Sequence, residues 1–148
     1  MRRPRIALVL PILPALLAGC DSTALEPEEV VGEWVLETIN GSPLPASPWL
    51  TPGFPAFILA DTLRLETDRR GSEVRVVRVD YPEPREDEVS TRTSTFTYTL
   101  VDGRIEVTLQ CPPTALCAPG PHFFGELDGA TLVARELGTT SELRFRRL

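Results

Sequence analysis

Short segments of alternating apolar and polar residues, separated by turn signals, constrain the fold of this chain more than any other feature. The clearest pair, residues 89–101 and 104–110, is joined by Asp102-Gly103, a dipeptide typical of tight β-hairpins. Apolar residues and threonines alternate across residues 95–100, which predicts a strand with one buried face. The same pattern predicts eight strands, at residues 30–39, 62–67, 72–80, 89–101, 104–110, 123–127, 131–136 and 142–147.

Eight antiparallel strands in sequential hairpins leave open edges unless the sheet closes on itself. The sequence therefore predicts an all-β fold, an eight-stranded antiparallel up-and-down barrel, with a two-sheet β-sandwich as the alternative. Asp128-Gly129 predicts a second tight turn. The apolar phase of residues 72–80 changes between Val76 and Val77, which indicates a β-bulge.

Asp61 shares a phase with Leu63 and Leu65. An early strand start would point Asp61 into the barrel, where it could orient a polar headgroup. We expect the strand to begin at Thr62 instead, leaving Asp61 in the preceding turn.

The N-terminus has the pattern of an export signal. Arginines at positions 2, 3 and 5 precede an apolar run over residues 6–17, which is shorter than the roughly 20 residues that a membrane-spanning helix needs. The run ends in Leu17-Ala18-Gly19-Cys20, which resembles a bacterial lipobox. The resemblance implies that residues 1–19 are removed and that Cys20 becomes a lipid-modified N-terminus. Its acyl chains would anchor the protein to a membrane of the cell envelope, facing the periplasm or the exterior.

After such processing, residues 20–29 form the lipidated N-terminus and an acidic tether, and residues 30–148 form one barrel domain. The mature chain keeps 12 basic and 21 acidic residues, a net charge of −9. This charge argues against nucleic acid or an anionic headgroup as a partner. We expect a monomer.

Lipidation of Cys20 leaves Cys111 and Cys117. Because the chain is exported, this close pair predicts a disulfide. A metal site that adds His122 is the alternative, but it lacks a fourth ligand and the Cys spacing of zinc sites. We expect no metal and no cofactor.

Gly32-Glu33-Trp34 resembles the G-x-W signature of lipocalins and of smaller lipocalin-like bacterial domains. The resemblance implies that Trp34 packs across the closed end of the barrel against an arginine from late in the chain, for which Arg147 is the candidate. Gly32, Trp34 and Arg147 are therefore interpreted as determinants of the fold.

In lipocalins the loop after the first strand covers the open end of the barrel, and residues 42–55 occupy that place. Five prolines separate its apolar residues, which include Leu44, Trp49, Leu50 and Phe54. These side chains either contact a ligand or partner or plug the barrel mouth. Short strands favour an interior filled by the protein's own side chains.

Catalysis has little support, since the chain has one histidine, no free cysteine once the disulfide forms, and no G-x-S-x-G motif. We expect no enzyme. One hypothesis is that the barrel binds a small apolar or amphipathic ligand. The alternative is a protein-interaction module, an inhibitor or envelope assembly factor, that uses the loops at residues 42–55 and 111–122. The volume of the interior distinguishes them.

Overall fold

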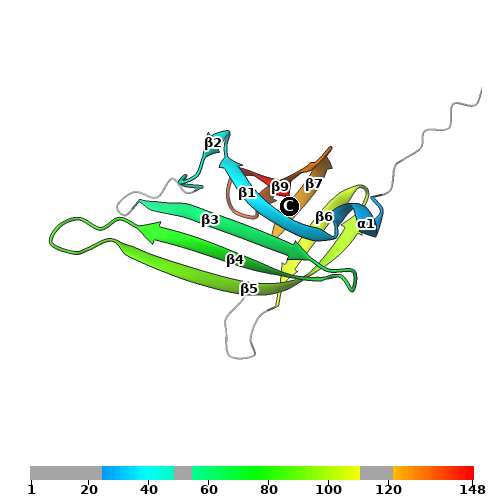
Figure 1. Ribbon diagram of the computed structural model, residues 1–148, viewed down its shortest axis with the longest axis horizontal. Coiled ribbons are helices and arrows are strands. Elements are labelled where there is room, and N and C mark those ends of the chain that lie inside the picture. Colours follow the sequence, from blue (N-terminus) through cyan, green and yellow to red (C-terminus); the bar gives the residue numbers. More distant parts are fainter. Residues whose placement is uncertain (1–24, 49–54, 111–121) are drawn as a thin grey trace, which may run out of the picture.

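The computed structural model describes residues 25–48, 55–110 and 122–148. Within these ranges nine antiparallel strands form one sheet, and β1 also pairs with β9, which closes the sheet into a barrel (Figure 1). The strands are β1 (Gly32–Ile39), β2 (Ser42–Pro43), β3 (Ala56–Leu65), β4 (Arg70–Val79), β5 (Glu88–Val101), β6 (Arg104–Leu109), β7 (Phe123–Asp128), β8 (Thr131–Glu136) and β9 (Glu142–Arg147). The ring holds eight of them, and β2 pairs with β1 outside it. The predicted barrel is confirmed.

A single helical turn, α1 (Pro27–Val30), precedes β1. The Glu29 carboxylate accepts a hydrogen bond from the Glu26 backbone N–H at 2.9 Å, which caps the turn. Val30 is fully buried. The helical turn is thus packed onto the barrel through Val30, while Glu28 and Glu29 of the predicted tether stay exposed. No helix in the described ranges is both long and apolar enough to cross a membrane.

The tight turns follow backbone chemistry. Asp102-Gly103 has positive φ at both residues (49° and 76°), as a type I′ hairpin requires, so the predicted turn is confirmed. Asn40-Gly41 has the same geometry (φ 50° and 77°) and makes the additional β1–β2 hairpin. The second predicted turn lies one residue later than Asp128-Gly129. Its central residues are Gly129-Ala130, with positive φ at the glycine alone (61°).

β3 begins at Ala56, six residues before the predicted start. Asp61 therefore lies within the strand and is fully buried, so the prediction that it sits in a turn is wrong. The register changes between Ile58 and Ala60, which makes Leu59 the extra residue of a β-bulge. The bulge moves the inward phase from Ile58 to Asp61.

The bulge predicted within residues 72–80 is likewise placed on the wrong strand. β4 pairs with β5 without interruption from Arg70 to Val79. Its inward side chains include Glu73 and Val77, whereas Val74 is exposed. The apolar pattern changes phase between Val76 and Val77 because Val74 and Val76 are apolar residues on the outer face of a regular strand, while Val77 lies on the inner face.

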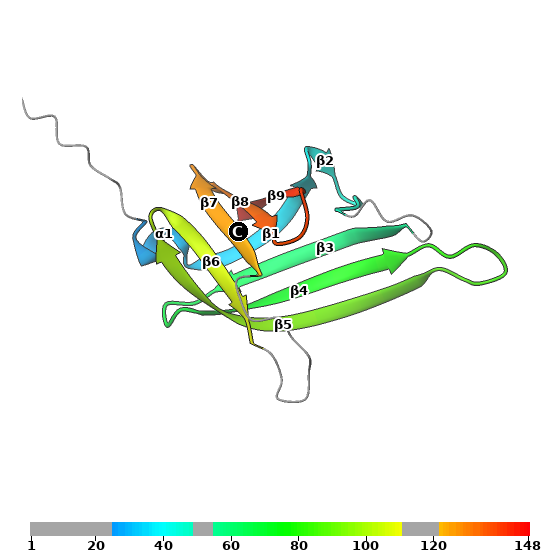
Figure 2. The ribbon, with the colours of Figure 1, turned by 180° about the vertical axis from the view of Figure 1, so that it is seen from behind.

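The strands differ in length. β3 and β4 have 10 residues and β5 has 14, whereas β6 to β9 have six each. The three long strands extend as a sheet beyond the ring (Figures 1 and 2). Short strands were predicted, and this is wrong for one side of the barrel. The interior is filled by buried side chains, of which the largest are Trp34, Tyr98, Phe96, Phe145, Ile39, Ile58, Leu63 and Leu65.

Candidate functional site

One end of the barrel is closed by Trp34. Its side chain is buried, and its indole N–H donates a hydrogen bond to the Val30 carbonyl at 2.9 Å. Trp34 and Arg147 are partners in the β1–β9 register, and the Arg147 guanidinium lies 5.7 Å from the centre of the Trp34 ring system. This is the contact that the lipocalin resemblance implied.

Arg147 also holds the chain that enters the barrel. Its guanidinium donates hydrogen bonds to the carbonyls of Val31, Glu29 (3.4 Å) and Glu28 (3.4 Å). A Cβ at Gly32 would lie 3.0 Å from Arg147 Nε, and Gly32 has a φ of +145°. Only glycine accepts this backbone without strain. Gly32, Trp34 and Arg147 thus form one structural unit, in which the Arg147 guanidinium binds neutral backbone carbonyls.

The predicted lid loop is described at residues 42–48 and at Pro55. Leu44 packs against the core, and Ala46 exchanges two backbone hydrogen bonds with Ile58 (3.2 and 2.8 Å). Ser141 Oγ donates to the Pro48 carbonyl at 2.6 Å. This part of the loop is therefore fastened to the barrel. The predictions for Cys20, Trp49, Leu50, Phe54, Cys111 and Cys117 lie outside the described residues.

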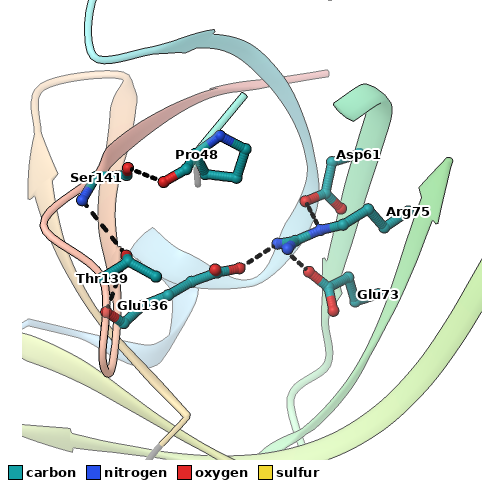
Figure 3. Close-up of polar contacts among 7 residues, drawn as sticks. All are labelled: Pro48, Asp61, Glu73, Arg75, Glu136, Thr139 and Ser141. Carbon is teal, nitrogen blue, oxygen red and sulfur yellow. Dashed lines mark hydrogen bonds and ion pairs between the residues drawn. The ribbon is translucent and has the colours of Figure 1, made fainter. Parts of the chain in front are cut away.

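Four charged side chains lie inside the barrel near its other end, where β1, β4 and β8 end (Figure 3). We call them the Arg75 cluster: Asp61, Glu73, Arg75 and Glu136. Arg75 Nε lies 2.8 Å from Asp61 Oδ2, and Arg75 Nη2 lies 2.7 Å from Glu73 Oε1 and 2.6 Å from Glu136 Oε1. The exposed fraction of these side chains is 12% or less.

The cluster crosses the lumen. In the ring of eight strands, β8 lies four places from β4, so Glu136 reaches Arg75 from the opposite wall (Figure 3). A cavity of about 10 Å³ lies beside the cluster, lined by Glu73, Arg75 and Glu136 and by apolar residues that include Leu63 and Phe123. That volume holds about one water molecule.

Burial dominates the electrostatics of Asp61. Burial raises the pKa of Asp61 to about 7, Arg75 opposes this rise, and the charges of Glu73 and Glu136 add to it. Burial disfavours the Arg75 cation, but the three carboxylates outweigh that effect and raise the pKa of Arg75. With Asp61 near half protonation at neutral pH, the cluster can take up or release a proton.

Asp61 Oδ1 is buried and has no hydrogen-bond partner among the described residues. A buried acceptor without a partner is destabilising by about 1–3 kcal/mol. A water or a small donor group would remove that penalty. No group of His, Cys, Asp and Glu side chains within the described ranges is placed to hold a metal ion.

Sequence reasoning found Asp61 as a candidate and missed its three partners. Because Val74 and Val76 are apolar, alternation predicts that they point inward, whereas the buried residues of β4 are on the phase of Glu73 and Val77. One signal was available: Glu73 and Arg75 share the phase of the buried Val77. Charged side chains rarely point inward unless they are paired. The partners of Arg75 on the other strands, Asp61 and Glu136, are distant from it in sequence and could not be recognised from β4 alone.

Comparison of the chain with protein-family models, with curated proteins and with solved structures gave no match.

Proposed function

We propose that this protein is a lipid-anchored module of the bacterial cell envelope that binds a protein partner with the outside of a filled barrel. The observation that carries the proposal is the ion pair between Arg75 and Glu136 across the lumen, beside a cavity of about 10 Å³. Pockets for drug-sized ligands have volumes of about 300–1,000 Å³. The cavity beside this ion pair is far smaller than that.

The lipid anchor is supported by Leu17-Ala18-Gly19-Cys20. Six residues separate Cys20 from Pro27, where α1 begins. An extended chain spans at most about 3.5 Å per residue, so the tether keeps the barrel within roughly 25 Å of the membrane surface. An anchored module of this kind presents its binding surfaces close to the membrane.

The test uses the full chain expressed in a bacterial host, with Cys20→Ala as the matched variant. We expect the parent in the membrane fraction, with an intact mass that corresponds to a chain starting at Cys20 plus acyl chains, and the variant without the mass of the acyl chains. An unmodified, secreted parent chain would overturn the anchor.

The filled barrel is tested separately on the purified protein. We expect native mass spectrometry to show no stoichiometric apolar adduct, and an environment-sensitive apolar dye to gain no fluorescence at protein concentrations in the micromolar range. A bound lipid or saturable dye binding would contradict the filled interior.

A second candidate function is favoured by the unpartnered Asp61 Oδ1. In this alternative, an amphipathic ligand places a hydrogen-bond donor beside Asp61 at the barrel end and keeps its apolar part outside the lumen. Binding would then weaken in Asp61→Leu and leave Glu37→Leu unaffected, because Glu37 lies on the outer face. Equal binding by both variants excludes this alternative.

A further inference from the structure

The first half of β5 is an open sheet edge. β5 pairs with β4 from Glu88 onward, but with β6 only from Phe96 onward. In the described ranges, no strand pairs with the other side of residues 88–94. Figure 1 shows this half of β5 as the margin of the long sheet.

The direction of the backbone groups on this edge follows from two hydrogen bonds. The Tyr98 N–H donates toward β4, to the Arg69 carbonyl, and the Thr95 carbonyl accepts from Gln110 on the opposite side. In antiparallel sheets, successive residues alternate the side to which both backbone groups point. The N–H and C=O groups of Val89, Thr91 and Thr93 therefore point outward from the open edge, and all three residues are exposed.

Natural edges of this length are usually protected by lysine, proline, a bulge or a covering segment. Residues 88–94 contain no lysine, proline or glycine, and β4 pairs with them without a bulge. Their charged residues are Glu88 and Arg92, both exposed and on the same face of the strand. Arg92 forms no ion pair with the described residues and is the register partner of Arg75 in β4. Glu88 lies 3.4 Å from the Arg85 guanidinium in an exposed ion pair.

We propose that this edge pairs with the same edge of a second copy of the chain, antiparallel, with Ser90 opposite its own copy. In this register each Glu88 lies opposite Arg92 of the other copy. Val89 and Thr91 then form hydrogen-bonded pairs across the interface, and the Glu88–Arg92 pairs occupy the positions where side chains approach most closely. The edge is thus complementary to itself in charge as well as in backbone pairing.

The pairing departs from the monomer that the sequence favours. A two-fold axis perpendicular to the joined sheets relates the copies, so both N-termini can reach one membrane when the sheets lie parallel to it. The pairing itself does not depend on the partner or the anchor proposed above.

Cysteine crosslinking tests the register. Opposed residues of this type have Cα atoms about 4.5 Å apart, within the range of a disulfide. Ser90→Cys in the full chain should give a covalent dimer under oxidising conditions, in membranes or in purified protein, that reductant reverses. Ser94→Cys is the matched control, because Ser94 has the same face and burial; its two copies would be more than about 20 Å apart. It should crosslink no more than the parent.

A charge swap tests the recognition. In the Ser90→Cys background, Arg92→Glu or Glu88→Arg alone should reduce the dimer yield roughly tenfold, since two attractive pairs become repulsive. Combining both substitutions should restore the yield. Thermal unfolding checks that each variant keeps the fold. The proposal is wrong if Ser90→Cys and Ser94→Cys crosslink equally, or if neither crosslinks. It is also wrong if Thr91→Cys crosslinks and Ser90→Cys does not, or if the double swap fails to restore the yield.

Discussion

Each end of the barrel is organised around one arginine, and the two arginines have opposite surroundings. Arg147 lies over the Trp34 ring and binds neutral carbonyls. Arg75 lies inside the barrel and binds three carboxylates. The same type of side chain therefore joins β9 to α1 and β1 at one end of the barrel, and neutralises buried carboxylates at the other. Only the second arrangement links stability to the uptake of protons.

The largest effect is expected from Arg75→Met. The substitution leaves three buried carboxylates without their cation, and breaking a buried ion pair in this way costs about 3–5 kcal/mol. Urea denaturation at neutral pH would measure the loss in the free energy of unfolding. The matched control is Arg78→Met in the same strand, because the Arg78–Asp80 pair is about one-third exposed and such pairs contribute about 0–1 kcal/mol. Similar losses in both variants would contradict a special role for the cluster.

The next effect is a pH dependence carried by Asp61. Its pKa is about 7 in the folded protein against a usual value of 3.8, so between these values the folded chain holds a proton that the unfolded chain has released. The stabilisation from that proton is full below about pH 4 and is lost as the pH rises to about 7.

Asp61→Asn removes this titration. The difference in unfolding free energy between parent and variant should therefore fall by an amount on the order of a few kcal/mol from pH 4 to pH 7. Denaturant titrations of both proteins across that range measure it. A difference that stays constant with pH would show that Asp61 titrates at its usual value.

A smaller effect is expected from Arg147→Ala. Loss of the contact with Trp34 and of the hydrogen bonds to α1 should reduce the free energy of unfolding by about 1–2 kcal/mol, with no change in its pH dependence between pH 5 and 8. Arg146→Ala is the control, since the neighbouring Arg146–Glu37 pair is half-exposed and contributes less than about 1 kcal/mol. A reversed order of the two losses would contradict the role given to Arg147.

The predictability of the two ends differs for a physical reason. The closed end was found from Gly32, Trp34 and Arg147, because a resemblance links them and because the first and last strands of a closed barrel must lie side by side. The tight turn at Asp102-Gly103 was found from local backbone chemistry. These features depend on residues that are adjacent in sequence or fixed by topology.

The Arg75 cluster depends on long-range pairing. Its members come from β3, β4 and β8, and the single residue Leu59 decides which phase of β3 faces inward. Alternation alone favoured Val74 over Glu73 as the buried residue of β4. Glu73 and Arg75 can be buried because Glu136 on the opposite wall pairs with Arg75. The residue pattern of β4 alone does not reveal this partner.

The pairing of β1 with β9 has a consequence for how the molecule is made. Trp34 and Arg147 are opposite each other in this seam although more than a hundred residues separate them, and pairings between distant residues form slowly. The hairpins from β3 to β8 join neighbours in sequence and can form as soon as their residues are available. The barrel can close only after Arg147 has emerged from the machinery that makes or exports the chain. Until then the side of β1 that pairs with β9 is an open sheet edge, which can pair with other chains and cause aggregation.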